Sequence, residues 1–271
     1  MEDSTIAKFD VIKKDLTGKK ILVAFSGGVD SSVLASIVAE VAAETILLLI
    51  SSPTVPESEL IGAKTIAKEL GLKLIVKNFD WLNEKSLAAN PIDRCFKCKQ
   101  ILADSWLKTA EEYSMEIVVE GTTASETEGY RPGAKALEES GVKSPYLDVG
   151  ITKDEIRQYA RNRGLSVAEK PSGACLATRF PYGTELTQER LQMVETVEKA
   201  VASIFNVECV RARYHGDLVR IEVGVDELTK MFDATKMKEL EQQARDAGFV
   251  HITLDLKGYR TGAMDEGLDL N

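Results

Sequence analysis

Short apolar runs alternate with longer segments of helical period along the first 120 residues. Four runs rich in β-branched residues and leucine are the candidate strands: 20–25, 45–50, 73–77 and 116–120. Such runs are typical of strands that are buried on both faces. Apolar positions of helical spacing follow the first run, at 33, 34, 37, 38 and 41. A second helix is expected from about 57 to Leu70, because Gly71 is a common helix stop. The alternation predicts an α/β fold, a doubly wound parallel sheet with helices on both faces.

The pattern changes near residue 185. The expected elements are a long amphipathic helix, two strands joined by a tight turn, a further helix and a last strand: 191–204, 210–214, 218–223, 226–247 and 251–255. This αββαβ order is that of a smaller α+β domain. The segment 170–185 is rich in Pro, Gly, Ser and Thr, so we place the boundary there. We expect one domain over 1–184 and a second over 185–271, with 258–271 as a loose tail.

Composition and charge narrow the class of protein. The chain has 271 residues, 44% of them hydrophobic and 28% charged, which is ordinary for a globular protein. The N-terminal segment lacks the apolar core of a signal peptide, and no run reaches the about 18 apolar residues of a membrane span. We therefore expect a soluble, cytoplasmic protein without a membrane partner. Lys and Arg number 34 against 43 Asp and Glu, a net charge of −9 that disfavours a nucleic-acid partner.

A glycine-rich segment follows the first expected strand and leads directly into the first helix. It reads Ser26-Gly27-Gly28-Val29-Asp30-Ser31-Ser32. The glycines let the backbone approach an anion closely, the serines add hydroxyl groups, and the helix N-terminus adds free N–H groups and partial positive charge. The segment is neither a Walker loop nor a dinucleotide fingerprint, because the residues that define those motifs are missing. It indicates a phosphate-binding loop.

This segment closely resembles the PP-loop of the ATP pyrophosphatase superfamily, whose members cleave ATP between the α- and β-phosphates and adenylylate a substrate oxygen. The resemblance implies that five residues hold the pyrophosphate: Ser26, Gly27, Gly28, Ser31 and Ser32. Asp30 would brace the loop or meet Mg²⁺, although the helix dipole also favours a carboxylate there. Gly121 and Thr122 end the fourth expected strand, where open α/β sheets bind ligands, so we expect nucleotide contact at both.

The four cysteines are Cys95, Cys98, Cys175 and Cys209. In a chain expected in the cytoplasm, they indicate thiols, metal ligands or catalytic groups before disulfides. Cys95 and Cys98 form a Cys-x-x-Cys with basic neighbours at the expected start of a helix that runs to about 114. Cys175 lies in a segment rich in turn residues. Cys209 precedes a strand and is interpreted as a small core residue.

Spacing alone leaves several interpretations of the cysteines open. A redox pair needs only Cys95 and Cys98 and leaves Cys175 unexplained. Structural zinc takes four ligands, but the two histidines, His215 and His251, both lie in the second expected domain. Three cysteines suit a [4Fe–4S] cluster with one iron that is open to a sulfide or a substrate. Unrelated thiols are the remaining alternative.

Four motifs together resemble the LarE family of ATP-dependent sulfur transferases, over nearly the whole chain. They are the loop 26–32, Gly129-Tyr130-Arg131-Pro132-Gly133, the segment Cys-Leu-Ala-Thr-Arg-Phe-Pro-Tyr-Gly at 175–183, and Val-Arg-Ala-Arg-Tyr-His at 210–215. Family members adenylylate a carboxylate of a pyridinium dicarboxylate mononucleotide and convert it to a thiocarboxylate, on the way to the nickel-pincer cofactor of lactate racemase. One branch sacrifices the sulfur of a loop cysteine, and another, with three cysteines, is associated with a [4Fe–4S] cluster.

The resemblance implies the cluster branch, with Cys95, Cys98 and Cys175 as ligands and one iron without a protein ligand. It implies catalytic roles for Cys175 and Asp30, release of AMP and pyrophosphate, a small carboxylated nucleotide as substrate, and a homo-oligomer. The sequence does not identify the sulfide donor. The resemblance also implies a site for the substrate phosphate, formed by Arg179, Arg211, Arg213, Glu198 and Glu222.

The residues themselves support part of this phosphate site. Arg211 and Arg213 alternate along one expected strand and therefore point to the same face, and paired guanidinium groups suit a phosphate. A solvated strand face, with Glu198 and Glu222 as surface charges, is the alternative interpretation.

Other functions stay open at this point. The nearest is a PP-loop iron–sulfur tRNA thiolase, against which stand the net charge of −9 and the lack of a zinc-ribbon pair or basic appendage. An amide-forming synthetase is disfavoured because no glutaminase domain accompanies the loop. From a different class, the chain could be a non-catalytic regulator that binds a nucleotide or a cluster.

Overall fold

The computed structural model describes residues 3–126, 132–171, 173–260, 262–264 and 266. They fall into two compact units, the first formed by Met1–Ser52, Glu57–Phe79 and Asp93–Gly173, the second by Pro53–Pro56, Asp80–Ile92 and Ala174–Asn271. Residues 174–184, expected in the first domain, group with the second unit. The compact units do not show which parts of the chain fold independently. The domain limits 1–184 and 185–271 therefore stay a prediction. No helix in the described part of the chain is both long and apolar enough to cross a membrane.

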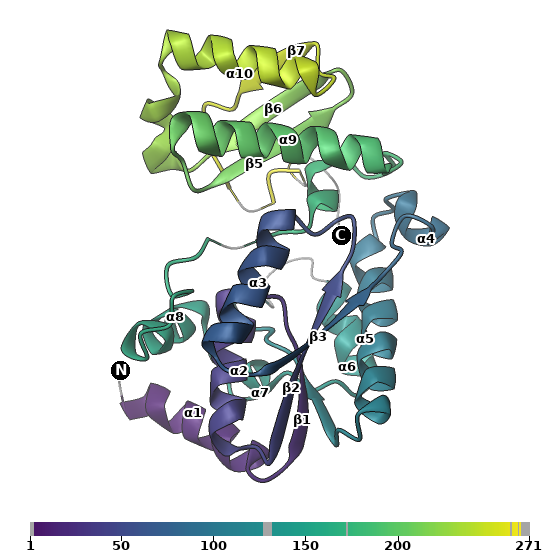
Figure 1. Cartoon of the computed structure of the whole chain (residues 1–271), viewed down its shortest axis with the longest axis vertical. Helices are drawn as coiled ribbons and strands as arrows, with labels where there is room; N and C mark the ends of the chain where they lie inside the picture. Colours follow the sequence, from purple (N-terminus) through teal and green to yellow (C-terminus); the bar gives the residue numbers. More distant parts are fainter. Residues whose placement is uncertain (1–2, 127–131, 172, 261, 265, 267–271) are drawn as a thin grey trace. The chain divides into compact units, whose positions relative to one another are not determined.

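The first unit is built on a parallel four-stranded sheet in the order β3-β2-β1-β4 (Figure 1). Its strands are β1 (Lys20–Ala24), β2 (Glu44–Ser51), β3 (Lys73–Asn78) and β4 (Ile117–Val119). All three pairings are parallel. The α/β fold and the four expected strands are confirmed.

Side chains along these strands alternate between two apolar cores, one on each face of the sheet. One core holds Val23 and Leu47 together with side chains from α1 (Asp3–Leu16), α2 (Val29–Val41), α3 (Glu57–Glu69), α7 (Pro145–Asp148) and α8 (Lys153–Asn162). The other holds Leu22 and Leu48 with α5 (Arg94–Glu112) and α6 (Pro132–Ser140). Helices on both faces confirm the doubly wound arrangement, although the sequence pattern did not indicate α1, α6 or α8. A short 3-10 turn, η1 (Ala124–Glu126), follows β4.

The connection from β1 to α2 presses closely against α3. Gly27 has φ +71°, and a Cβ built on it would stand 2.5 Å from Cα of Ala63. Gly28, with φ −78° and ψ 165°, is the N-cap of α2, and a Cβ there would meet only the Ser26 hydroxyl, at 3.4 Å. The chain path therefore requires a glycine at 27, whereas alanine fits at 28.

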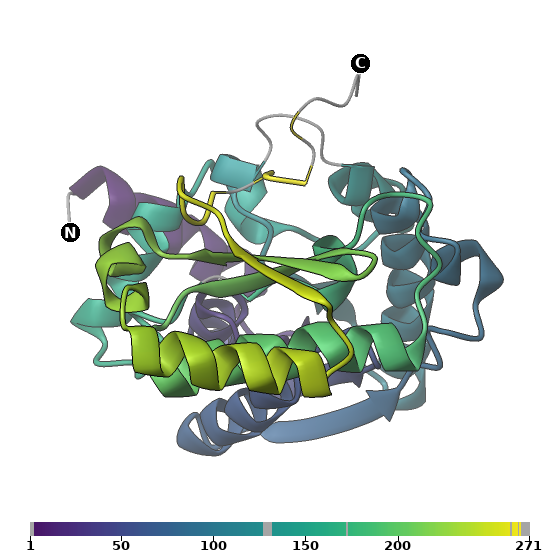
Figure 2. The same cartoon turned by 90° about the horizontal axis from the view of Figure 1, so that it is seen from above.

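The second unit has the expected αββαβ order. Its elements are α4 (Lys85–Ala88), η2 (Leu176–Arg179), α9 (Gln188–Phe205), β5 (Val210–His215), β6 (Leu218–Val223), η3 (Val225–Met231), α10 (Ala234–Asp246) and β7 (His251–Leu254). The sheet order is β5-β6-β7, with β5 antiparallel and β7 parallel to β6. Helices α9 and α10 lie side by side along one face of this sheet (Figure 2).

The prediction of a single helix from about 226 to 247 is wrong. The structure has a 3-10 segment, η3, and then α10, with a break at Phe232 and Asp233. The Asp233 carboxylate accepts the backbone N–H groups of Thr235 and Lys236 at 2.9 and 3.0 Å. An aspartate that caps these N–H groups starts a new helix, so the two segments are separate.

The first turn of α8 is tied to α1 through Glu155. Its carboxylate accepts the Lys8 ammonium at 2.9 Å, the Thr5 hydroxyl at 2.8 Å and the Thr152 backbone N–H at 2.8 Å. Burial alone would raise the pKa of this carboxyl, but the hydrogen bonds from Lys8, Thr152 and Thr5 outweigh burial and lower the pKa to about 2. Glu155 therefore stabilises the folded chain as an anion.

We predict that Glu155→Gln lowers the free energy of unfolding by about 2 kcal/mol at pH 7. The folded pKa lies below the ordinary value of 4.5, so this contribution is present above pH 4.5 and is lost as the pH falls toward 2. Urea unfolding at pH 7, 4.5 and 3 measures the difference in unfolding free energy between the wild type and Glu155→Gln. This difference should be smaller at pH 3. Glu169→Gln is the control, because Glu169 forms an exposed ion pair with Arg161. If the wild type and Glu155→Gln differ in unfolding free energy by the same amount at pH 7 and pH 3, the anionic form of Glu155 is not the source of the stabilisation.

We also predict that alanine destabilises the chain at one loop glycine and leaves its stability unchanged at the other. Gly27→Ala should destabilise the chain by about 1–3 kcal/mol, since it combines positive φ with an overlap against α3. Gly28→Ala should unfold at the wild-type temperature, because its backbone conformation suits alanine. Thermal unfolding of the two variants side by side tests this, and equal destabilisation would show that the loop takes another path.

Candidate functional site

The loop between β1 and α2 is braced by its own serine hydroxyls. Ser31 Oγ accepts the backbone N–H of Ser26 at 3.2 Å and donates to the Gly28 carbonyl at 3.2 Å. The hydroxyls of Ser26 and Ser31 lie 3.1 Å apart. These contacts hold the loop at the carboxyl end of β1, where the first N–H groups of α2 have no acceptor within the helix. Those N–H groups and the helix dipole suit an anion.

Ser32 lies at the same turn but differs from Ser31. Its side chain is fully buried, and its hydroxyl has no hydrogen-bond partner among the described residues. Its backbone N–H donates to the Gly28 carbonyl at 3.0 Å. A buried hydroxyl without a partner costs about 1–3 kcal/mol. The expected contact between Ser32 and a phosphate therefore requires this side chain to turn, and a phosphate oxygen would then supply the missing partner.

Asp30 forms an ion pair with Lys153, the first residue of α8. Its other carboxylate oxygen, Oδ1, is buried and has no partner in the described part of the chain. The Tyr146 hydroxyl donates to the Asp30 carbonyl at 3.2 Å, and burial, with the nearby Asp30 charge, holds the pKa of Tyr146 well above its usual value. These contacts fit the bracing role expected for Asp30. Because Mg²⁺ prefers carboxylate oxygens, Oδ1 is the atom here that suits the ion.

The end of β4 lies against this loop. A Cβ on Gly121 would stand 3.2 Å from the carbonyl carbon of Asp30 and from the nitrogen of Ser31. The Thr122 hydroxyl donates to the Glu120 carboxylate at 2.7 Å and its N–H donates to the same oxygen at 3.1 Å. Its side chain is thus engaged in the turn itself. The next residue, Thr123, has a buried hydroxyl without a partner among the described residues.

Two lysines at this loop were missed by the sequence analysis. Lys153 pairs with Asp30, and Lys170 contacts the Gly27 carbonyl at 3.1 Å. Thr152 followed by Glu155 is a capping-box pattern that marks the start of α8, so the helix itself had a local signal. No local signal indicated the partners of the two lysines, because each lysine lies more than a hundred residues from its partner along the chain.

None of the four cysteines forms a disulfide. Cys95 and Cys98 are the second and fifth residues of α5, three residues apart and so on one side of the helix. Cys95 and Cys175 are exposed. Burial raises the pKa of Cys209 despite the opposing charge of Arg211, which agrees with an inert thiol. Among the residues described, no group of three or more His, Cys, Asp or Glu side chains could hold a metal ion.

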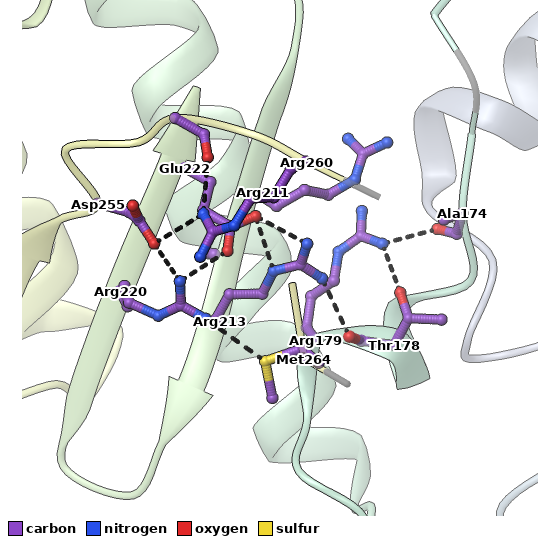
Figure 3. A network of polar contacts seen from close by, with 12 residues as sticks. Ala174, Thr178, Arg179, Arg211, Arg213, Arg220, Glu222, Asp255, Arg260 and Met264 are labelled. Atoms are coloured by element: carbon purple, nitrogen blue, oxygen red, sulfur yellow. Dashed lines mark hydrogen bonds and ion pairs between the residues drawn. The ribbon is translucent and has the colours of Figure 1, made fainter. Parts of the chain in front are cut away.

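Arg179 joins the Cys175 segment to α9. The guanidinium, which is 2% exposed, makes a two-pronged contact with Glu198 at 2.7 and 3.1 Å. Its remaining nitrogen donates to the Ala174 carbonyl at 3.1 Å, as Figure 3 shows, and to the Cys175 carbonyl at 3.3 Å. Glu198 also accepts the backbone N–H of Ala212 in β5, at 2.9 Å. One buried arginine thus fixes the backbone at Cys175 to a helix and, through Glu198, to a strand.

A second set of buried charges covers one face of the β5–β6 hairpin. Glu222, which is fully buried, accepts Arg213 at 2.8 Å and Arg220 at 2.9 Å. Arg213 also donates to the Thr178 carbonyl at 3.1 Å. Arg211 lies 5.0 Å from the centre of the Tyr259 ring, and burial together with the charge of Arg179 lowers its pKa. The five residues expected at a substrate phosphate therefore all belong to this unit, and Figure 3 shows four of them close together: Arg179, Arg211, Arg213 and Glu222.

The network extends beyond the predicted residues. Arg220 and Arg260 both pair with Asp255, and Arg260 also contacts Glu266. Among the described residues, five arginines and four carboxylates gather at this hairpin: Arg179, Arg211, Arg213, Arg220 and Arg260 with Glu198, Glu222, Asp255 and Glu266. The hairpin register could have identified Arg220, since a two-residue turn after His215 places it opposite Arg213. Of the motif at 129–133, residues 129–131 lie outside the described part of the chain.

No family model matches the chain. An uncharacterized protein of Synechocystis sp. is 32% identical over 250 residues, which cover 92% of this chain and 93% of the relative. An uncharacterized protein of Methanocaldococcus jannaschii is 30% identical over 250 residues, 92% of this chain and 94% of the relative. The pyridinium-3,5-bisthiocarboxylic acid mononucleotide synthase of Lactiplantibacillus plantarum is 29% identical over 258 residues, 94% of this chain and 91% of the synthase.

Shorter matches reach other enzymes of the PP-loop superfamily. One component of the glutamine-hydrolyzing GMP synthase of Methanococcus vannielii is 31% identical over 201 residues, 67% of this chain and 63% of the relative. The tRNA-specific 2-thiouridylase of Acetivibrio thermocellus is 26% identical over 211 residues, 62% of this chain and 59% of the relative. The full-length matches, together with the loop at the end of β1, show that the chain belongs to the LarE-like family of ATP-dependent, sulfur-inserting enzymes within the PP-loop ATP pyrophosphatase superfamily.

Proposed function

We propose that the protein uses ATP to adenylylate a carboxylate of a phosphorylated pyridinium-type mononucleotide and then replaces the adenylate by sulfur. The products would be a thiocarboxylate, AMP and pyrophosphate. The synthase of Lactiplantibacillus plantarum, which matches along nearly its whole length, supports this substrate class. The observation that carries the proposal is the contact of Arg179 with the Cys175 carbonyl, because it attaches a sulfur-bearing segment to an arginine network.

The loop at the end of β1 suits the first half of the reaction. A substrate carboxylate oxygen would attack the α-phosphorus of ATP, and the bond from that phosphorus to the bridging oxygen would break, so that pyrophosphate leaves. The N–H groups of the first turn of α2 would bind the departing phosphates. Asp30, held by Lys153, would brace this turn and offer Oδ1 to Mg²⁺. The result would be an acyl-adenylate, in which AMP is a good leaving group.

The arginine network suits the phosphate of the acid to be activated. Among the described residues, this partly buried set has five arginines against four carboxylates, a net positive charge that attracts an anion, and guanidinium pairs match phosphate oxygens. Arg179 makes this network continuous with the backbone of residues 174 and 175. A substrate held there by its phosphate would lie in the same unit as the exposed Cys175 thiol.

Two sources of sulfur are compatible with the cysteines. Cys95, Cys98 and Cys175 form no disulfide, and in number and chemistry they match the ligands of a [4Fe–4S] cluster with one open iron, although no group of three such side chains among the described residues is arranged to hold a metal ion. When bound, such a cluster would supply a replaceable sulfide. Alternatively, the Cys175 thiolate would attack the acyl carbon and displace AMP. Loss of its Cα proton and cleavage of its Cβ–S bond would then leave dehydroalanine, so each chain would react once.

A direct assay of pyrophosphate release tests the proposed function. With ATP and Mg²⁺, a pyridinium dicarboxylate mononucleotide should stimulate release, whereas the same nucleotide without carboxylates should not. The matching nucleoside without its phosphate should react with kcat/KM lower by about ten- to a hundredfold, because charge-assisted hydrogen bonds to the arginines are lost.

The same assay separates the competing functions. Stimulation by bulk tRNA, with a salt-sensitive gel shift, would favour the tRNA thiolase. ATP binding without pyrophosphate release under any of these conditions would favour a non-catalytic regulator.

Metal analysis of the anaerobically purified chain tests the sulfur source. We expect a brown protein with about four irons per chain and acid-labile sulfide. Cys95→Ala, Cys98→Ala and Cys175→Ala should each lose the colour, and Cys209→Ala is the matched control that should keep it. A colourless protein with one tightly bound zinc would contradict the cluster. A colourless protein whose Cys175 loses the mass of H₂S after one turnover would instead support the sacrificial route.

A further inference from the structure

We propose that Lys170 binds the pyrophosphate end of ATP and that Glu59 is the counter-charge that holds Lys170 when this end is absent. The inference rests on the proposed use of ATP at the loop between β1 and α2, and it adds a cation that the loop motif itself lacks. Lys170 follows α8, and Glu59 stands in the first turn of α3.

The Lys170 ammonium contacts the phosphate loop and the acid at the same time. Its Nζ donates to the Gly27 carbonyl at 3.1 Å and to Glu59 Oε2 at 2.7 Å. Both side chains are 24% exposed, so the pair is partly shielded and still reachable from solvent. The loop motif supplies N–H groups and hydroxyls, and Lys170 brings a full positive charge to its backbone.

The surrounding chain is built around this pair. Arg157 of α8 donates to the Ala168 carbonyl at 2.6 Å and to the Lys170 carbonyl at 3.0 Å, which fixes the backbone that carries the lysine. A Cβ on Gly62 would stand 3.3 Å from Lys170 Nζ, and one on Gly173 would stand 2.9 Å from the Glu59 carboxyl carbon. Two positions without side chains thus make room for the ammonium and the carboxylate.

The chemistry of an ammonium group explains how the pair would respond to a nucleotide. Nζ has three N–H donors, and the two contacts above account for two of them. The third is therefore available to a phosphate oxygen while both contacts stay in place. When the bond between the α- and β-phosphates breaks, the leaving pyrophosphate gains negative charge, which a cation at the loop would stabilise. A flexible lysine can also leave Glu59 altogether, because the ammonium acts as a point charge.

Calorimetric titration of the full-length chain with inorganic pyrophosphate, ATP and AMP, all with Mg²⁺, tests the inference. Lys170→Met should weaken pyrophosphate and ATP binding by about ten- to a hundredfold, the range expected for a charged hydrogen bond. AMP binding should stay the same, which a general loss of structure would not allow. Glu59→Gln should bind pyrophosphate more tightly, because the substitution removes a carboxylate that competes with pyrophosphate for the Lys170 ammonium and that repels it by its negative charge. Lys64→Met, on the exposed face of α3, is the matched control and should bind like the wild type.

Several results would overturn the inference. Wild-type pyrophosphate affinity in Lys170→Met would do so, and so would an equal loss of AMP and pyrophosphate binding. If Lys170→Met fails to fold, weaker pyrophosphate binding by Glu59→Gln would still count against the pair. A wild-type chain that binds neither ATP nor pyrophosphate would overturn the proposed function, and the inference with it.

Discussion

The phosphate loop depends on a backbone that lies against α3 with no side chain in between. Gly27 holds a positive φ, and a Cβ there would stand only 2.5 Å from Cα of Ala63, a separation that no side chain tolerates. This approach places the Gly27 carbonyl beside the Lys170 ammonium and brings Glu59 of α3 to the same point. A single backbone constraint therefore sets both the anion-binding turn and the charges around it.

Helix α8 joins the parts of the first unit that meet at this turn. Three residues near its start make three different contacts. Lys153 pairs with Asp30, Glu155 accepts Lys8 of α1, and Arg157 donates to the backbone carbonyls at residues 168 and 170. Two of these contacts act directly on the loop or on the lysine beside it. The stability of the first unit and the arrangement of its phosphate site thus depend on one helix terminus.

The second unit contains buried arginines that must be paired with carboxylates. Buried arginines are tolerated only when carboxylates and carbonyls take up their donors, and Glu198 and Glu222 do so for Arg179 and Arg213. Among the described residues, the arginines of this set outnumber its carboxylates by five to four. This arrangement fixes the Cys175 backbone and at the same time leaves the network attractive to a phosphate. The proposed position of the substrate follows from that balance.

The sequence by itself determined the features that local rules control. Apolar runs predicted the four strands, the glycine-rich turn predicted the anion site, and the period of two along β5 placed Arg211 and Arg213 on one face. Asp233 was a local signal too, and reading it as a helix cap would have corrected the overlong helix. The tertiary structure alone decided the partners of Lys153 and Lys170, which lie 123 and 143 residues from their contacts at the loop. Such partners are set by the packing of whole helices on the sheet, and no spacing along the chain records them.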